Sequence, residues 1–253
     1  DLDLIKLRAN GTSGSPIVIK DNIFQGDGST GYKGIETAYD AGYVKVENNE
    51  FDDLKYGAWF NVLTDSEIKG NTFTDAIFTA LALCTSDTDA IHDVDILDNT
   101  ILRSTTYADA ASHPGYAVWY SGMHIGSTVY NMDITGNTIA DGNYHAIVSH
   151  DRGTTDLSNV HINDNCMDNN PDGSLNEASA SITLDAEDNW WGDASGPSGV
   201  GPGSGDPVSA GFDYDPWLGF CPLVPPTTVW VDDGYDEAGC TADGHTWQYD
   251  CFN

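Results

Sequence analysis

Six short segments of the chain repeat one pattern: a β-branched residue, two variable positions, Asn, one variable position and a large apolar residue. The repeated Asn residues are Asn22, Asn49, Asn71, Asn99, Asn137 and Asn165. A degenerate seventh copy ends in Asn189-Trp190-Trp191. The Asn residues recur at intervals of 22 to 38 residues, a period typical of solenoids, in which each repeat buries its apolar face by stacking on its neighbours. The repeat therefore predicts a solenoid.

Each repeat begins with alternating apolar residues, as in Val94-Asp95-Ile96, and this alternation indicates a half-buried strand. We expect the Asn to lie at the bend that follows, because Asn tolerates left-handed backbone torsions better than most residues. Its side-chain amide can hydrogen-bond with the equivalent Asn of the coils above and below, which forms an internal ladder. The alternative is an ordinary set of Asn-rich turns. Six copies with apolar residues at fixed offsets favour the ladder.

A second strand is expected after each bend, and the longest interval carries residues 104–114 as an insertion. No stretch shows helical periodicity over three turns, so we expect almost no helix. The chain is predicted to be all-β, with about seven coils over residues 17–191, spaced about 4.8 Å apart. Phe24, Phe51 and Phe73 should form one internal column. A second column should contain Ile19, Val46, Ile68, Ile96, Ile134 and Ile162.

These repeats resemble the right-handed parallel β-helix proteins of the pectin-lyase-like superfamily, and the resemblance covers roughly residues 15–220. The segment Asp188-Asn-Trp-Trp-Gly192, with Ser195-Gly-Pro197, resembles the terminal motif of bacterial and archaeal surface proteins of this type. We expect Trp190, Trp191, Pro197 and Trp217 to pack over the last coil. The resemblance implies a β-helix domain over residues 1–224, followed by a linker and tail over 225–253 that resembles the start of another β-helix.

The chain carries 40 acidic and 9 basic residues, a formal net charge of −31. Such a surface repels nucleic acid and anionic membranes, and it suits divalent cations or a saline setting. No run of 18 apolar residues occurs, so no membrane span is expected. The hydrophobic content of 40% argues against a disordered chain.

The five Cys residues leave at least one thiol unpaired. Cys240 and Cys251 bracket a polar loop and are predicted to form a disulfide, with Cys221 as the spare thiol. Cys84 and Cys166 fall within the coils, where Cys is most often a small buried hydrophobe. An extracellular or cell-surface location is expected, and Asn10-Gly-Thr12 is a candidate glycosylation site.

Catalysis has to be considered, because the superfamily includes polysaccharide lyases and hydrolases. A lyase needs a base beside the substrate carboxylate, whereas Lys20 and Lys69 read as surface positions of one repeat column. Hydrolases use clustered acidic residues. Asp52, Asp53, His150 and Asp151 are the candidates for such a site, although chance pairs are expected among forty acidic residues.

Two kinds of binding site are also suggested. Aromatic faces stack on sugars, so Trp119, Tyr144 and His145, with His150 and His161, are candidates for a glycan groove; the alternative is that they are surface or core residues of successive coils. Acidic loops offer oxygen ligands at short spacing, suitable for calcium. The candidate calcium ligands are Asp27, Asp87, Asp89 and Asp185, with simple solvated turns as the alternative.

The sequence thus favours a non-enzymatic extracellular β-helix, a subunit or module of a surface layer or filament, with glycan binding as an additional expectation. No cofactor is required, and calcium is the candidate ion. The expected partners are further copies joined end to end, or tandem β-helix modules, and a polysaccharide. An open solenoid end exposes unpaired strand edges that can pair with another chain. The runner-up is a lyase or glycoside hydrolase acting on an acidic polysaccharide.

Overall fold

A computed structural model describes residues 2–28, 31–37, 41–83, 90–104, 120–126, 128–150, 155–178 and 181–223. The chain divides into two compact units, Asp1–Cys221 and Pro222–Asn253, whereas the sequence placed the boundary between residues 224 and 225. All structural statements below concern the first unit. Cys240 and Cys251 lie outside the described residues, as do Cys84, Asp87, Asp89, Trp119 and Asp151.

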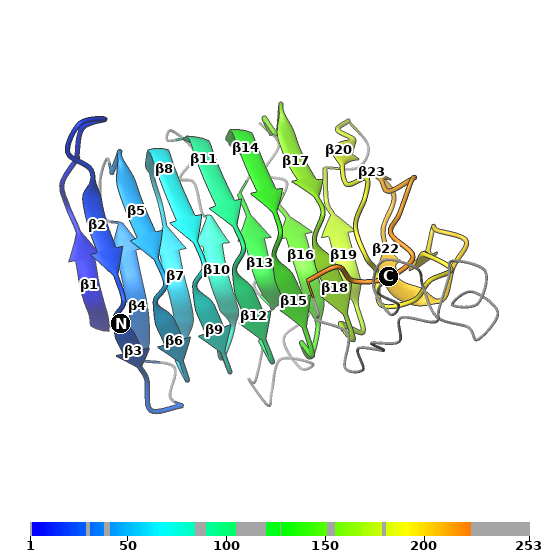
Figure 1. Cartoon of the computed structure of the whole chain (residues 1–253), viewed down its shortest axis with the longest axis horizontal. Coiled ribbons are helices and arrows are strands. Elements are labelled where there is room, and N and C mark those ends of the chain that lie inside the picture. The colour runs from blue at the N-terminus through cyan, green and yellow to red at the C-terminus, as the bar shows by residue number, and fades with distance from the viewer. Residues whose placement is uncertain are drawn as a thin grey trace, which may run out of the picture. The chain divides into compact units, whose positions relative to one another are not determined.

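The first unit is a solenoid built from three parallel sheets, and its described residues contain no helix (Figure 1). The nine-stranded sheet has the order β1(Leu2–Leu7), β4(Tyr32–Thr37), β7(Tyr56–Phe60), β10(Thr79–Leu83), β13(Ser121–Ile125), β16(His145–Ser149), β19(Gly173–Asn176), β22(Gly205–Val208), β21(Pro197–Gly199). The eight-stranded sheet has the order β2(Ile17–Lys20), β5(Val44–Glu47), β8(Leu63–Lys69), β11(Ile91–Leu97), β14(Val129–Thr135), β17(Val160–Asn163), β20(Leu184–Asp185), β23(Phe212–Asp213). The six-stranded sheet has the order β18(Cys166–Asp168), β15(Thr138–Ala140), β12(Thr100–Leu102), β9(Thr72–Thr74), β6(Glu50–Asp52), β3(Ile23–Gln25). From β1 to β18, each successive set of three strands contributes one strand to each sheet, and the strands after β18 add only to the nine-stranded and eight-stranded sheets. The predicted all-β parallel solenoid is confirmed.

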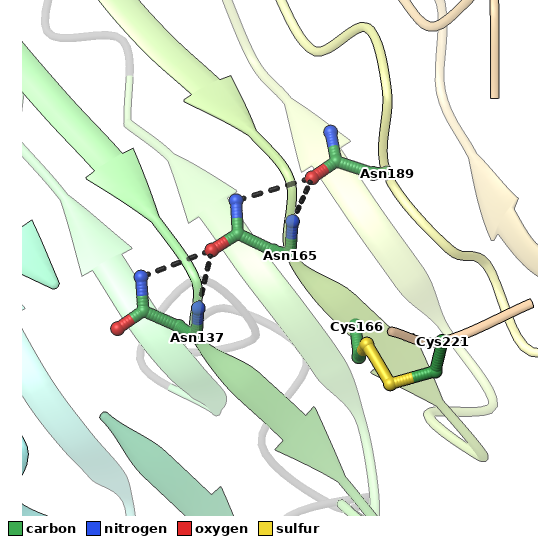
Figure 2. Close-up of a disulfide and its surroundings, with 5 residues drawn as sticks. All are labelled: Asn137, Asn165, Cys166, Asn189 and Cys221. Atoms are coloured by element: carbon green, nitrogen blue, oxygen red, sulfur yellow. Dashed lines mark hydrogen bonds between the residues drawn. A yellow bond between two sulfur atoms is a disulfide. The ribbon is translucent and has the colours of Figure 1, made fainter. Parts of the chain in front are cut away.

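The predicted Asn ladder joins the eight-stranded sheet to the six-stranded sheet (Figure 2). Asn99 shows the pattern: its Oδ1 accepts hydrogen bonds from the backbone N–H and the Nδ2 of Asn71, both at 2.9 Å. Its own Nδ2 donates to the carbonyl oxygen of Ile68 at 2.9 Å and to Oδ1 of Asn137 at 3.0 Å. The same bonds continue through Asn165 to Asn189. Because these buried amides are fully paired, the polar bend fits inside an apolar core.

The left-handed torsion at this bend lies one residue earlier than predicted. The residue before each ladder Asn has φ between 52° and 71°, and the ladder Asn itself does not have positive φ. These preceding residues are Asp21, Asn48, Gly70, Asp98, Gly136, Asp164 and Asp188. The left-handed residue turns the chain, and the Asn that follows aims its amide along the solenoid axis. Asp, Asn and Gly are the residues that reach this conformation most readily.

Both predicted internal columns are present. Phe24 stacks on Phe51 and Phe51 on Phe73, with centroids 4.6 and 4.5 Å apart and planes inclined by 7° in each pair. Strand register continues this column through Ile101, Ile139 and Met167, and the bridge between Cys166 and Trp190 places Trp191 next. The column Ile19, Val46, Ile68, Ile96, Ile134 and Ile162 is also in register.

A Trp closes the ladder at the C-terminal end of the solenoid. The residue after each ladder Asn donates its N–H to the carbonyl of the previous ladder Asn, as Thr72 does to Asn49. Leu218 donates to Asn189 in the same way, so Trp217 occupies the next ladder position. Trp217 has no side-chain acceptor, and its ring packs against Gly196, where a Cβ would lie 2.4 Å from it.

The structure corrects the assignment of two cysteines. Cys166 and Cys221 form a disulfide with a Cα–Cα distance of 5.5 Å (Figure 2). Interpreting Cys221 as the spare thiol and Cys166 as a simple buried hydrophobe was therefore wrong. The chain between them, over a sequence separation of 55, returns to β18 at the end of the six-stranded sheet. The disulfide thus ties the segment that follows the last coils to the solenoid.

A second buried polar contact lies beside this disulfide-bonded end. Asn170 and Asp206 are both buried, and Asn170 donates to Asp206 from its backbone N–H at 3.0 Å and from Nδ2 at 2.8 Å. Burial nevertheless raises the pKa of the Asp206 carboxyl to about 6. This end of the solenoid therefore contains an acid whose charged form is disfavoured.

Candidate functional site

The outer face of the nine-stranded sheet brings together the largest set of aromatic and basic side chains described here. A Cβ at Gly34 or Gly57 would collide with the core rings of Phe51 and Phe73, and Ile35 and Ala58 also belong to the core. Lys33 and Glu36 flank this inward pair and hydrogen-bond to each other, so both lie on the outer face. Strand register then defines two outward columns. The first contains Asp3, Lys33, Tyr56, Thr79, Ser121 and His145. The second contains Lys6, Glu36, Trp59, Ala82, His124 and Val148.

A charged network occupies the N-terminal end of this face. Glu36 accepts hydrogen bonds from Lys33 Nζ at 2.6 Å and from Lys6 Nζ at 2.7 Å. Burial acts to raise the pKa of Glu36, but the bonds from Lys33 and Lys6 lower it overall, to about 2. The Lys33 ammonium also lies 4.8 Å from the centroid of the Trp59 ring, within the range of a cation–π contact.

Four aromatic rings form a stripe along the same sheet. Successive centroids are 5.7 Å apart for Tyr56 and Phe78, 5.6 Å for Phe78 and Tyr120, and 5.6 Å for Tyr120 and Tyr144. Lys55 Nζ lies 5.6 Å from the Tyr56 centroid. Burial, with a smaller contribution from the Lys33 charge, lowers the pKa of Lys55. The surroundings therefore disfavour the charged form of this amine.

Imidazole groups lie at the C-terminal end of the face. The rings of His124 and His150 are 5.6 Å apart, and His150 Nδ1 lies 3.1 Å from an oxygen of Glu177. His124 is buried, and so is Ser121 beside it in the next column. Exposure on this face is partial: Lys55, Trp59 and Tyr144 are half-buried, whereas Tyr56 and Tyr120 are buried.

The structure brings together some of the glycan candidates. Tyr144 ends the aromatic stripe, and His145 follows it in the outward column, with Nδ1 3.0 Å from the carbonyl oxygen of Asp172. His150 belongs to the same face. His161 does not, because it lies on β17 of the eight-stranded sheet, where its ring contacts Asp185.

The catalytic candidates do not converge. Asp52 ends β6 of the six-stranded sheet and accepts a hydrogen bond of 2.6 Å from Thr74 Oγ1. Asp53 has φ of 52°, as do the residues after β9, β12, β15 and β18 within a few degrees, so it occupies a repeated turn position. His150 follows β16 of the nine-stranded sheet, three strands from β7. Strand spacing puts it more than about 14 Å from the coil of Asp52.

The candidate calcium ligands are also separated. Asp27 lies in an exposed turn after β3, and Asp185 lies on β20 at the other end of the solenoid. Burial acts to raise the pKa of Asp185, but hydrogen bonds from His161 and Asn163 lower it overall. Within the described ranges, no group of three or more His, Cys, Asp or Glu side chains is arranged to hold a metal ion. Asn10 is exposed, and its Oδ1 accepts a hydrogen bond from the Gly42 N–H.

Sequence reasoning missed most of the outer face, because it followed the Asn repeat and not the second strand of each coil. A signal was present: Lys55-Tyr56, Phe78, Tyr120 and Tyr144 all begin or immediately precede that strand. Tyr56, Phe78 and Tyr144 each follow the ladder Asn of their coil by seven residues, and only Tyr120, after the insertion at 104–114, departs from this offset. Aligning these strands on the Asn of the same coil would have exposed the stripe.

The family model for the right-handed beta helix region matches residues 8–190. The chain belongs to the right-handed β-helix family. No curated protein and no solved structure matches it. Among the described residues of this β-helix protein, no helix is long and apolar enough to cross a membrane.

Proposed function

We propose that this β-helix protein is an extracellular, non-enzymatic module of a cell-surface layer or filament that binds a glycan on the outer face of its nine-stranded sheet. The observation that carries the proposal is the aromatic stripe from Tyr56 to Tyr144, with Lys55 beside it. Calcium is proposed as an ion that can bridge the acidic protein and an acidic glycan, with no resident cofactor.

Stacked aromatic rings offer flat apolar faces and polar edges, which suit the alternating apolar faces and hydroxyl edges of sugars. Tyr56 and Tyr120 are buried, whereas Phe78 and Tyr144 are half-buried and precede strands that lie two apart in the sheet. An extended polymer would contact the exposed parts of these two rings. Lys55 and Lys33 add positive charge to a protein whose net charge is −31. The proposed ligand is therefore an acidic polysaccharide, with a carboxylate near Lys55, because Lys33 is buried and hydrogen-bonded to Glu36.

Three properties of the chain support the proposed cell-surface location and structural role. The disulfide between Cys166 and Cys221 is of a kind that persists in oxidising compartments. The strongly acidic surface keeps a densely packed protein soluble and discourages contact with nucleic acid. A solenoid with a rigid paired interior is also suited to a structural role.

The experiment is a calorimetric titration of the protein with acidic and neutral oligosaccharides, with and without calcium. We expect saturable binding of the acidic ligand and about fivefold weaker binding after Tyr144→Ala, since one lost ring stack costs about 1 kcal/mol. Tyr130→Ala is the matched control, because Tyr130 stacks on His92 on the eight-stranded sheet. Absence of binding, or an equal loss in both variants, would refute the site.

The runner-up is a polysaccharide lyase, favoured by one observation: the lowered pKa of Lys55 moves this amine toward the range of a general base. Incubation with uronate polymers and calcium, followed by ultraviolet absorbance of unsaturated products, separates the two functions. We expect no product. Turnover that disappears in Lys55→Met and persists in Lys69→Met would establish the enzyme and displace the proposed binding role.

A further inference from the structure

The outer side of the eight-stranded sheet carries a pocket between β17 and β20. It is lined by residues 155–161, 181–183 and 185, and its volume is about 430 Å³. These residues belong to the two strands and to the segments that precede them, so two neighbouring coils form the pocket (Figure 1). The volume is within the range of small-molecule sites. This hollow is the His161 pocket.

The imidazole of His161 is held in one orientation and one tautomer. Its Nδ1 lies 2.8 Å from Oδ2 of Asp185. Burial acts to raise the pKa of the Asp185 carboxyl, but hydrogen bonds from His161 and Asn163 lower it overall, so this group is ionised and only accepts. Nδ1 therefore carries the hydrogen, which leaves Nε2 of the neutral ring as an acceptor. Among the described residues, Nε2 has no hydrogen-bond partner.

Asn159 presents a second acceptor to the pocket. Asn131 Nδ2 donates to a carboxylate oxygen of Asp93 at 3.3 Å, and this bond fixes which end of the Asn131 amide is the oxygen, because a carboxylate only accepts. Asn131 Oδ1 in turn accepts a hydrogen bond from Asn159 Nδ2 at 2.9 Å. The nitrogen of the Asn159 amide thus points toward β14, and its oxygen faces the opposite side, where β20 lies.

The serine hydroxyls of the pocket use their hydrogens within the protein. Ser158 Oγ donates to Asp156 Oδ1 at 2.7 Å, and Ser181 Oγ donates to the carbonyl of Ala178 at 3.3 Å. Both hydroxyl oxygens keep lone pairs that can accept. Asp156 Oδ2 has no hydrogen-bond partner among the described residues. The wall of the His161 pocket therefore consists mainly of hydrogen-bond acceptors.

The charge of the pocket favours the same kind of ligand. Asp156 and Asp185 line it, and none of its lining residues is Lys or Arg. Asp133 pairs with His161 in the strand register and adds another carboxylate nearby. An anion would be repelled here, whereas an ammonium group has three donors and no acceptor. A ligand with a primary ammonium group matches both the charge and the hydrogen bonding of the wall.

The pocket also has an apolar part and a hydroxyl that suit a sugar ring. Ile182 packs partly against the core and keeps partial exposure, and the exposed Thr183 hydroxyl beside it can donate as well as accept. We propose that the His161 pocket binds an amino sugar, whose ammonium group donates to the acceptors of the wall and whose ring covers Ile182. The glycan site proposed for the nine-stranded sheet lies on a different sheet, so neither site depends on the other.

The test is an NMR titration of the full chain, followed at the histidine side chains. The unliganded protein should show His161 protonated at Nδ1 and not at Nε2. Glucosamine should shift the His161 resonances saturably. Glucose and N-acetylglucosamine lack the ammonium group, and methylamine lacks the sugar ring, so each should bind about tenfold more weakly than glucosamine.

Two substitutions test the wall of the pocket, with binding followed at backbone amides. Asp156→Asn removes the charge and keeps an acceptor for Ser158, whereas His161→Phe keeps a flat ring without its nitrogens. Each should weaken glucosamine binding about tenfold. Asp95→Asn is the matched control, because it removes the same charge from the same outward column two strands away. It should change the affinity less than about twofold.

The proposal is overturned if glucosamine gives no saturable shift, or if glucose or methylamine binds as tightly as glucosamine. An equal loss in Asp95→Asn and Asp156→Asn would show attraction to the acidic surface as a whole. Unchanged affinity in Asp156→Asn and His161→Phe would place the ligand elsewhere. Either result refutes the His161 pocket. Tyr144→Ala, on the nine-stranded sheet, should bind glucosamine normally, and a loss there would also contradict the proposal.

Discussion

Replacing Asn99 by Ala tests how much the internal ladder stabilises the solenoid. The Asn99 side chain is buried and takes part in four hydrogen bonds, to the N–H and Nδ2 of Asn71, the carbonyl of Ile68 and Oδ1 of Asn137. Ala leaves the Asn71 donors and the Ile68 carbonyl without partners in a site that admits little water. At about 1 kcal/mol for each bond lost, the substitution should cost about 3–5 kcal/mol of unfolding free energy.

Asn22→Ala is the matched control on the same ladder. The Asn22 side chain donates to Asn49 Oδ1 and to the carbonyl of Lys20, in an exposed coil. Water can replace these bonds, so the cost should stay below about 1 kcal/mol. Urea unfolding followed by tryptophan fluorescence measures both variants, with the free energy extrapolated to water. Equal losses in the two variants, or a loss below about 1 kcal/mol for Asn99→Ala, would refute the reasoning.

Three further predictions concern the C-terminal end and the core. Reducing the Cys166–Cys221 disulfide, which closes 55 residues, should lower stability by about 4 kcal/mol in the chain-entropy model; thermal unfolding with and without reductant measures this, and an unchanged midpoint contradicts it. The pKa of Asp206 is raised to about 6 in the folded protein. The folded state therefore holds this proton more tightly than the unfolded state. The stability that the protonated Asp206 carboxyl provides is fully present below the unfolded pKa and is lost as pH rises toward 6. The wild type should therefore lose about 2 kcal/mol over this range relative to Asp206→Asn, and parallel pH profiles of the two proteins would count against it. Phe51→Ala opens a cavity between Phe24 and Phe73 and should cost about 3–5 kcal/mol, whereas Ile23→Ala, at a side chain 70% exposed, should change the urea midpoint little.

The repeat predicted the coils because its residues act locally and identically in each turn. Asn71 and Phe73, for example, have fixed offsets from Ile68, so bend and column follow from one short motif. The torsion was assigned one residue too late because Asn and Asp commonly adopt positive φ, and sequences such as Asp98-Asn99 contain both candidates. Only the structure distinguishes the two residues: Asp98 has the left-handed φ, and Asn99 makes the ladder hydrogen bonds.

The place of Tyr120 in the aromatic stripe, and the disulfide, depended on distances that no local motif contains. Tyr120 and Tyr144 meet because two coils of different length return to the same sheet. Cys221 reaches Cys166 because the last segment folds back to the end of the six-stranded sheet.

By itself, the sequence determined a parallel solenoid with an Asn ladder, since every coil repeats the same strand, bend and apolar offsets. The tertiary structure decided which side chains gather on the outer face, and that Trp217 occupies the ladder position after Asn189. The reason is physical: local patterns fix the turn of one coil, whereas loop lengths and strand register fix which residues of different coils become neighbours.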